Sequence, residues 1–224
     1  IAQAEQFARD GLLDTALAAF AMVLEDNPRQ IDAHIGIGDI YEVKGDYEEA
    51  ATKYKTAKTI DPTNYKATYK LGLMYHLLNR VQAAIAEYLD ALAIRPNSFE
   101  ANLNLATAYL QINEAQLGLP YAEAAVKLNA DSQTAHTNLG SIYASLGQHN
   151  LAIDEYRAAL ELGELKPQLA LNLAESLLKV GRHQQALNTL KALQRTHDTG
   201  AVRERLGYTY FKLGEYQSSL AAYE

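Results

Sequence analysis

The chain has 224 residues, of which 48% are hydrophobic and 21% are charged, a balance typical of a folded protein rather than a disordered one. Its formal net charge is -7 without a long run of like charge, which favours neither nucleic acid nor an anionic membrane surface as a partner. The absence of cysteine excludes disulfides, iron–sulfur clusters and thiolate zinc sites.

The predicted elements follow one another at a period of 34 residues. Proline recurs at this step at Pro28, Pro62 and Pro96. Two further series keep the same step, one of small residues and one of tyrosines: Gly38, Gly72, Ala106, Gly140 and Ala174, and Tyr41, Tyr75, Tyr109 and Tyr143. So many matched positions at one period indicate an array of structural repeats.

Each repeat predicts two helices. The first should end at a residue suited to the left-handed conformation, and the positions are Gly45, Asn79, Asn113, Gly147, Gly181 and Gly214. The second begins near a small residue, at Ala50, Ala84, Gly118, Ala152 and Ala186. Small residues in both helices let the two backbones approach, so we interpret Tyr54, Tyr88 and Tyr156 as core residues that fill the remaining gap.

We predict a single domain over 1–224, in which the repeats occupy 1–30 (partial), 31–64, 65–98, 99–132, 133–166, 167–199 and 200–224 (partial). Four residues depart from the pattern: Ala130 and Glu164 replace the terminal proline, Ala122 replaces the large aromatic residue and Leu177 replaces tyrosine. The last partial repeat is rich in apolar residues, and a repeat array normally ends in a polar cap. We therefore expect the chain to be an excerpt of a longer protein.

This pattern resembles the tetratricopeptide repeat (TPR) family over essentially the whole chain. The resemblance implies an all-α fold, an α-solenoid of helix-turn-helix repeats that forms a right-handed superhelix. It also implies that the first helices line a concave groove. The function implied is a non-catalytic protein–protein interaction scaffold that binds an extended peptide or partner segment there.

The outward stripe of the first helices is polar in three successive repeats: Glu100, Asn104, Thr107 and Gln111, then Thr134, Asn138, Ser141 and Ser145, then Gln168, Asn172, Glu175 and Lys179. Asn, Ser and Thr each cost a helix roughly 0.5 kcal/mol relative to Ala, so a merely solvated stripe would favour other residues. A carboxamide both donates and accepts hydrogen bonds, as a peptide backbone requires.

Asn104, Asn138 and Asn172 also recur at the 34-residue step. This asparagine ladder is similar to those of the TPR arms of O-GlcNAc transferase and kinesin light chains, which implies that it holds an extended peptide. The alternative is that the three amides bond to one another or to neighbouring helices and bind no ligand.

The stripe changes character toward the N-terminus, where it carries Asp32, Gly36, Asp39 and Val43 in one repeat and Lys66, Lys70, Leu73 and Leu77 in the next. Lys66 and Lys70 lie one turn apart and would suit a peptide carboxylate, although solvated lysine pairs of this kind are common and are the favoured interpretation. The predicted peptide-binding groove therefore comprises Asn104, Asn138, Asn172, Thr107, Gln111, Ser141, Lys66, Lys70 and Glu175.

No residue pattern indicates catalysis. The serines have no histidine and carboxylate in a recognisable arrangement, and the six histidines are scattered. We expect His34 and His136 to be partly buried in the packed end of their helices. We predict no metal site, no cofactor and no enzymatic activity, and no apolar stretch long enough for direct membrane insertion.

Two other functions stay open. One is a substrate-recognition TPR arm of a larger enzyme, such as a glycosyltransferase. The other is a self-assembling structural scaffold in bacterial secretion or export, with homo-oligomers formed through the terminal repeats. The sequence leaves the compartment undecided, with the cytoplasm favoured and the periplasm possible.

Overall fold

The computed structural model describes residues 1–224, and all of its regular elements are α-helices. The chain divides into two compact units, residues 1–112 and residues 113–224, and we describe each by itself. The boundary falls within the repeat predicted at 99–132. None of the helices is both long and apolar enough to span a membrane.

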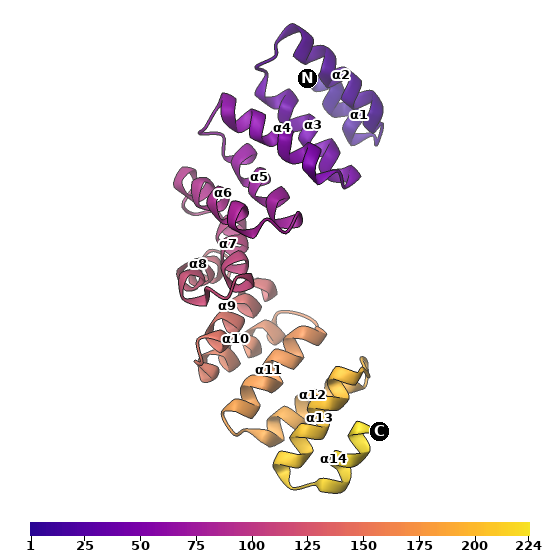
Figure 1. The fold of residues 1–224 in the computed structure, drawn as a ribbon, viewed down its shortest axis with the longest axis vertical. Helices are drawn as coiled ribbons and strands as arrows, with labels where there is room; N and C mark the ends of the chain where they lie inside the picture. The colour runs from indigo at the N-terminus through magenta and orange to yellow at the C-terminus, as the bar shows by residue number, and fades with distance from the viewer. The chain divides into compact units, whose positions relative to one another are not determined.

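Seven helices form each unit (Figure 1). Unit 1 contains α1 (Ala2–Arg9), α2 (Leu13–Asp26), α3 (Ile31–Lys44), α4 (Tyr47–Ile60), α5 (Tyr65–Leu77), α6 (Val81–Ile94) and α7 (Phe99–Gln111). Unit 2 contains α8 (Ala115–Leu128), α9 (Gln133–Ser145), α10 (His149–Glu161), α11 (Pro167–Lys179), α12 (His183–Gln194), α13 (Gly200–Leu213) and α14 (Tyr216–Tyr223).

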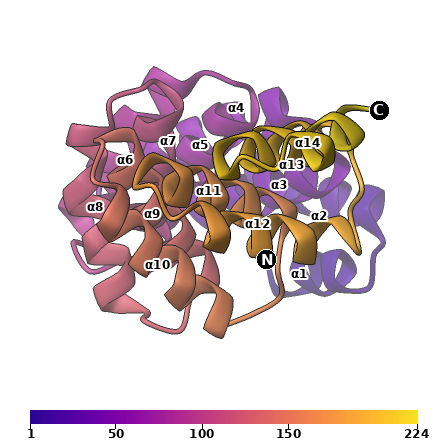
Figure 2. The same ribbon diagram turned by 90° about the horizontal axis from the view of Figure 1, so that it is seen from below.

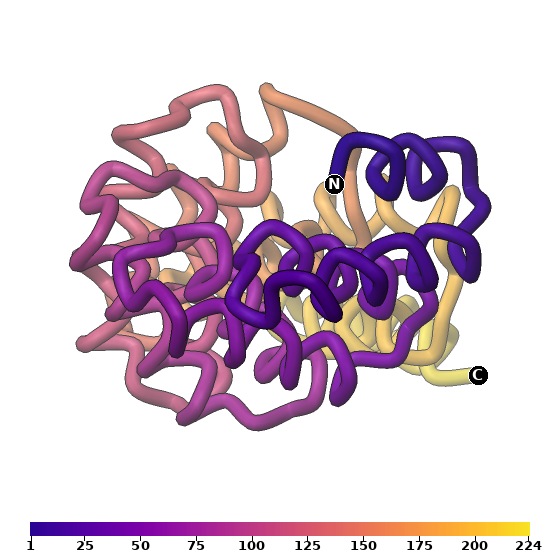
Figure 3. The backbone as a smooth tube through the Cα atoms, turned by 90° about the horizontal axis from the view of Figure 1, so that it is seen from above, coloured from indigo at the N-terminus to yellow at the C-terminus, as the bar shows by residue number.

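Within each unit every helix packs against the next one along the chain, as α3, α4 and α5 do in unit 1 and α9, α10 and α11 do in unit 2 (Figure 2). The connections are short turns, which the backbone trace shows (Figure 3). The odd-numbered helices are the first helices of their repeats, and α5 also contacts α7, as α9 contacts α11. These contacts confirm the predicted all-α solenoid of helical hairpins.

The turns within the repeats use the predicted left-handed residues. All six positions have a positive φ, with values from 56° at Asn79 to 82° at Gly45. Gly11, one period before Gly45, has a φ of 76° and ends the first helix of the partial repeat in the same way. Because L side chains disfavour this conformation, Gly and Asn at these positions stop the first helix and reverse the chain.

The small and large residues within a hairpin pack as complementary pairs. A Cβ atom on Gly38 would lie 2.7 Å from the Tyr54 ring, and one on Gly140 would lie 2.6 Å from the Tyr156 ring. Tyr54, Tyr88 and Tyr156 are fully buried, as we predicted. Where the first helix carries alanine instead, the partner is not tyrosine: Ala106 corresponds to Ala122, and Ala174 corresponds to Leu190.

His34 and His136 are wedged at the start of their helices, as predicted, with His34 buried and His136 half-buried. Their Nε2 atoms lie 2.9 Å from the carbonyl oxygens of Pro28 and Ala130 respectively. Asn102 stands at the same repeat position and donates from Nδ2 to the carbonyl oxygens of Pro96 and Ser98. A polar side chain here therefore hydrogen-bonds to the turn that joins one repeat to the next.

Candidate functional site

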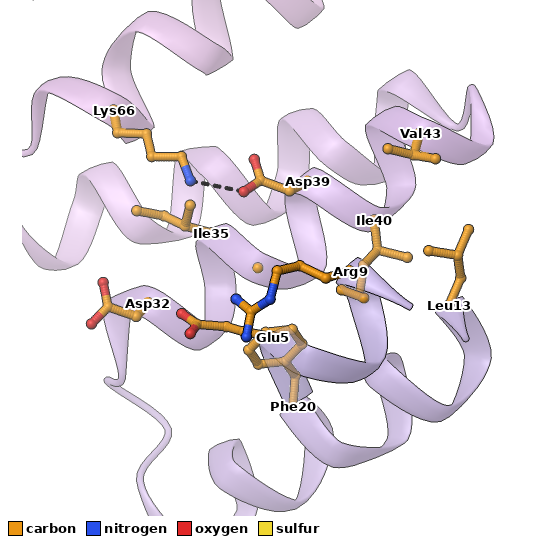
Figure 4. Close-up of a pocket in the computed structure, with 12 residues that line it drawn as sticks. Glu5, Arg9, Leu13, Phe20, Asp32, Ile35, Asp39, Ile40, Val43 and Lys66 are labelled. Atoms are coloured by element: carbon orange, nitrogen blue, oxygen red, sulfur yellow. Dashed lines mark hydrogen bonds and ion pairs between the residues drawn. The ribbon is translucent and has the colours of Figure 1, made fainter. Parts of the chain in front are cut away.

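The first helices of unit 1 enclose a pocket of about 350 Å³ (Figure 4). Its walls come from α1, α3 and the start of α5, with two residues from α2, Leu13 and Phe20. All four residues of the N-terminal outward stripe line it, and the complete lining is Asp32, Gly36, Asp39 and Val43 together with Glu5, Ala8, Arg9, Leu13, Phe20, Ile35, Ile40 and Lys66. The stripe that the sequence places outside the hairpin core thus faces a hollow.

Gly36 makes room for the floor of this pocket. A Cβ atom at Gly36 would lie 2.4 Å from Cζ of Phe20, whose side chain is buried beneath it. Gly36 also stands at the repeat position that holds Lys70 and Asn104 further along unit 1. At Gly36 the Phe20 ring therefore lies where the later repeats carry a polar side chain.

The sequence analysis named five of the lining residues, Asp32, Gly36, Asp39, Val43 and Lys66, but did not predict the pocket. The available signal was the one glycine in the series that otherwise carries Lys70 and the three ladder asparagines. What the sequence did not reveal is that the Phe20 ring lies against that glycine.

Lys66 and Lys70 are paired with carboxylates of their own chain. Lys66 Nζ lies 2.8 Å from Asp39 Oδ2, and Lys70 Nζ lies 2.9 Å from Glu42 Oε2. Tyr54 donates its hydroxyl to both carboxylates, at 2.7 and 2.8 Å. Burial, aided by these carboxylates, raises the pKa of Tyr54 and keeps it a neutral donor. A peptide carboxylate would therefore have to displace an internal partner from either lysine.

Asn104 lies on α7, half-buried, and donates from Nδ2 to the hydroxyl oxygen of Tyr69 on α5, at 2.9 Å. Tyr69 stacks on Tyr65 with 5.8 Å between ring centroids. Burial raises the pKa of Tyr69 to about 12, so the phenol is neutral at physiological pH. This ladder amide is thus bonded to the neighbouring first helix.

Gln111 and Thr107, also on α7, have internal partners too. Gln111 donates from Nε2 to Asn79 Oδ1 at 3.1 Å, and its Oε1 lies 2.9 Å from His76 Nε2. The Thr107 hydroxyl donates to the Leu103 carbonyl oxygen within the helix, at 2.9 Å. Gln111 is exposed and Thr107 half-buried, so both remain on the surface of the first helix.

In unit 2, Asn172 on α11 connects to Ser141 on α9. Its Nδ2 donates to Ser141 Oγ at 3.3 Å, and its Oδ1 accepts from Gln168 at 2.7 Å. Tyr156 also donates its hydroxyl to Ser141 Oγ, at 3.3 Å. Asn138, half-buried, precedes Ser141 by one turn of α9. Like Asn104, Asn172 donates a hydrogen bond to a neighbouring first helix. The alternative stated above, in which the amides bond within the chain and bind no ligand, expects such hydrogen bonds.

Glu175 lines a second pocket, of about 300 Å³, between α11 and α13. Its carboxylate lies 2.8 Å from Arg205 and 3.8 Å from Lys179. Leu178, Tyr208 and Tyr223 add apolar surface to the same pocket. Across residues 1–224, no group of three or more histidine and carboxylate side chains is placed to hold a metal ion.

The family model described as TPR repeat matches residues 38–79 and 72–113, and the model described as tetratricopeptide repeat matches residues 103–169 and 171–224. The chain belongs to the tetratricopeptide repeat family. No curated protein matches it.

Three solved structures share the fold of this chain. YrrB, described as a TPR protein with an unusual peptide-binding site, is 20% identical with a TM-score of 0.71, covering 91% of this chain and 97% of its own. A MamA fragment from Desulfovibrio magneticus RS-1 is 23% identical with a TM-score of 0.71, covering 75% and 97%. PilF from Pseudomonas aeruginosa is 16% identical with a TM-score of 0.73, covering 96% and 94%. At these identities the likeness concerns the fold alone.

Proposed function

We propose that this TPR chain is a non-catalytic protein–protein interaction scaffold that binds an extended peptide or partner segment along the side formed by its first helices. One observation carries the proposal: the outward stripe of α3 lines a pocket of about 350 Å³ with both apolar and charged walls. Pockets of this size and mixed lining suit the side chains of a ligand. The description of YrrB as a TPR protein with a peptide-binding site supports the same class of ligand.

The ladder amides are the proposed contacts for the peptide backbone. Asn104 and Asn172 would exchange their hydrogen bonds to Tyr69 and Ser141 for bonds to the ligand, and Asn138 lies on the corresponding face of α9. Such an exchange costs little net energy, because one hydrogen bond replaces another. Thr107, Gln111 and Glu175 would add contacts to ligand side chains.

Selection of peptides from a random nonapeptide library on the intact chain tests this function. We expect binding peptides to be enriched. We further expect the triple variant Asn104→Ala/Asn138→Ala/Asn172→Ala to bind a selected peptide at least tenfold more weakly in fluorescence anisotropy. Each substitution leaves a polar group of the bound peptide unpaired, which costs about 1 kcal/mol, or roughly a factor of five in affinity.

The control variant removes three exposed amides from second helices, Gln82→Ala/Gln116→Ala/Gln217→Ala, and should bind normally. Circular dichroism of both variants checks the fold. Absence of any enriched peptide contradicts the proposed function, and unchanged affinity of the triple asparagine variant removes the ladder from it.

A further inference from the structure

In the N-terminal pocket, two carboxylates occupy the positions that form an ion pair one repeat later. In the second full repeat, Lys66 on α5 binds Asp39 on α3 at 2.8 Å. The residues 34 positions earlier are Asp32 on α3 and Glu5 on α1. The repeat thus places a second carboxylate where the next repeat supplies an ammonium group.

The hydroxyl that supports Asp39 is missing from the earlier position too. Tyr54 donates its hydroxyl to Asp39 at 2.7 Å, whereas the equivalent residue, Phe20, has no hydroxyl to offer Glu5. Glu5 and Asp32 therefore have neither the lysine nor the tyrosine that their counterparts use. Both side chains are exposed, and neither takes part in an ion pair or hydrogen bond.

The two cations of the pocket, Arg9 and Lys66, do not supply the positive charge that Glu5 and Asp32 lack. Arg9 donates to Gln6 Oε1 at 2.8 Å, and Lys66 is bound to Asp39. The lining contains three carboxylates, Glu5, Asp32 and Asp39, against the two cations. A further cation between Glu5 and Asp32 would reproduce the pairing that the chain builds for itself at Asp39.

The opposite end of the pocket is apolar. Leu13, Ile40 and Val43 lie together there, away from the carboxylates of Glu5 and Asp32 (Figure 4). Asp32 and Ile40 are eight residues apart on α3, or about 12 Å along the helix axis. Side chains four residues apart on an extended peptide lie on one face and about 13 Å apart, which matches this separation.

We propose that the pocket recognises an extended partner segment in which a lysine or arginine lies four residues from an apolar residue. The basic side chain bridges Glu5 and Asp32, and the apolar side chain packs against Leu13, Ile40 and Val43. This inference rests on the proposed function and specifies the chemistry of its ligand at one site.

The nonapeptide selection on the intact chain tests the sequence preference directly. The enriched peptides should share a lysine or arginine four positions before or four positions after a leucine, isoleucine, valine or phenylalanine (i and i+4). In a selected peptide, replacing the basic residue by glutamate should weaken binding at least tenfold. Moving it by one position, to the opposite face of the extended chain, should have the same effect.

Variants of the protein test the two carboxylates. Glu5→Gln/Asp32→Asn should weaken binding of a selected peptide at least tenfold. Asp32→Lys should do the same, because it supplies the missing cation from within the chain. The matched control, Glu25→Gln/Glu49→Gln, removes two exposed and unpaired carboxylates outside the pocket with the same change in net charge, and should bind normally. All four mutated side chains are exposed, so folding is preserved, which circular dichroism checks.

The outcomes separate the two proposals. Enriched peptides without a basic residue at this spacing, or affinity unchanged in Glu5→Gln/Asp32→Asn, overturn the inference while the proposed function stands. A selection that enriches no peptide overturns both. Equal weakening in the control variant also overturns the inference, since it would show a general charge effect rather than this site.

Discussion

At the scale of single residues, most hairpins depend on a pair of positions of complementary size, a small residue in the first helix and a larger one in the second. Gly140 and Tyr156 form such a pair, because a Cβ atom on the glycine would lie 2.6 Å from the ring. Ala174 and Leu190 form another in the following repeat, where the smaller side chain leaves space for the methyl group. The two positions must therefore change together.

Gly140→Ala should destabilise the chain by about 1–2 kcal/mol. Overpacking a buried site costs about 1–3 kcal/mol, and alanine in a helix returns at most about 1 kcal/mol. Urea denaturation of both proteins measures the difference.

Two variants control this prediction. Gly200→Ala, where the new methyl group meets no neighbouring atom within 4 Å, should be neutral or stabilising. Gly140→Ala should also cost less in a Tyr156→Leu background, which reproduces the pair at Ala174 and Leu190. Equal costs in both backgrounds would contradict the pairing.

Buried tyrosines make stability depend on alkaline pH. Burial raises the pKa of Tyr69 to about 12, above the value near 10 of an unfolded chain, and it raises the pKa of Tyr88 as well. The folded state thus favours the protonated phenol. This contribution is complete below about pH 10 and is lost as the pH rises toward 12.

We therefore expect urea midpoints that are constant from pH 8 to 9 and fall between pH 10 and 11. Tyr69→Phe has no phenol to ionise at this position and should lose less stability over the same interval. Absorbance at 295 nm measures ionisation of the tyrosines. If the buried tyrosines ionise near pH 10 and the chain loses no stability, their pKa values are not raised by burial, which would contradict this prediction.

At the scale of helices, the boundaries were predictable because they depend on local residues. Gly45 and Gly147 end first helices with a positive φ, and the sequence shows them directly. The 34-residue spacing then determines which helices neighbour each other. The hydrogen-bond partners of polar side chains were less predictable. Asn104 donates to Tyr69 and Asn172 donates to Ser141, and both contacts depend on rotamers and helix spacing, which a residue pattern does not specify.

Pro120 lies inside α8, beyond the first turn, where it provides no N–H for the carbonyl of Gln116. Pro120→Ala should stabilise the chain by about 1–2 kcal/mol, since the helix gains up to about 3 kcal/mol and the unfolded chain gains some freedom. Differential scanning calorimetry measures the change.

Pro167 is the matched control for this substitution. It occupies the first turn of α11, where proline fits, so Pro167→Ala should be neutral or destabilising. A lower stability for Pro120→Ala would show that this proline has a packing role that outweighs the lost hydrogen bond.

At the scale of the whole chain, the sequence predicted the row of helical hairpins that the structure shows, but it did not identify the pocket. That ligands bind along the first helices stays a prediction. The pocket depends on Phe20 lying against Gly36, a contact between different repeats that no local pattern reveals. The sequence also did not single out Glu5 and Asp32 as candidate ligand contacts. Their proposed role follows from the ion pair that the structure shows at the equivalent positions, Asp39 and Lys66.

Photo-crosslinking of a selected nonapeptide that carries a benzophenone group tests most directly whether ligands bind along the first helices. The crosslinked chain is digested, and mass spectrometry of the fragments locates the crosslinked residues. We expect crosslinks to the first helices, with α1 and α3 prominent among them. Crosslinks confined to the second helices, such as α4, α6, α10 and α12, would contradict this expectation.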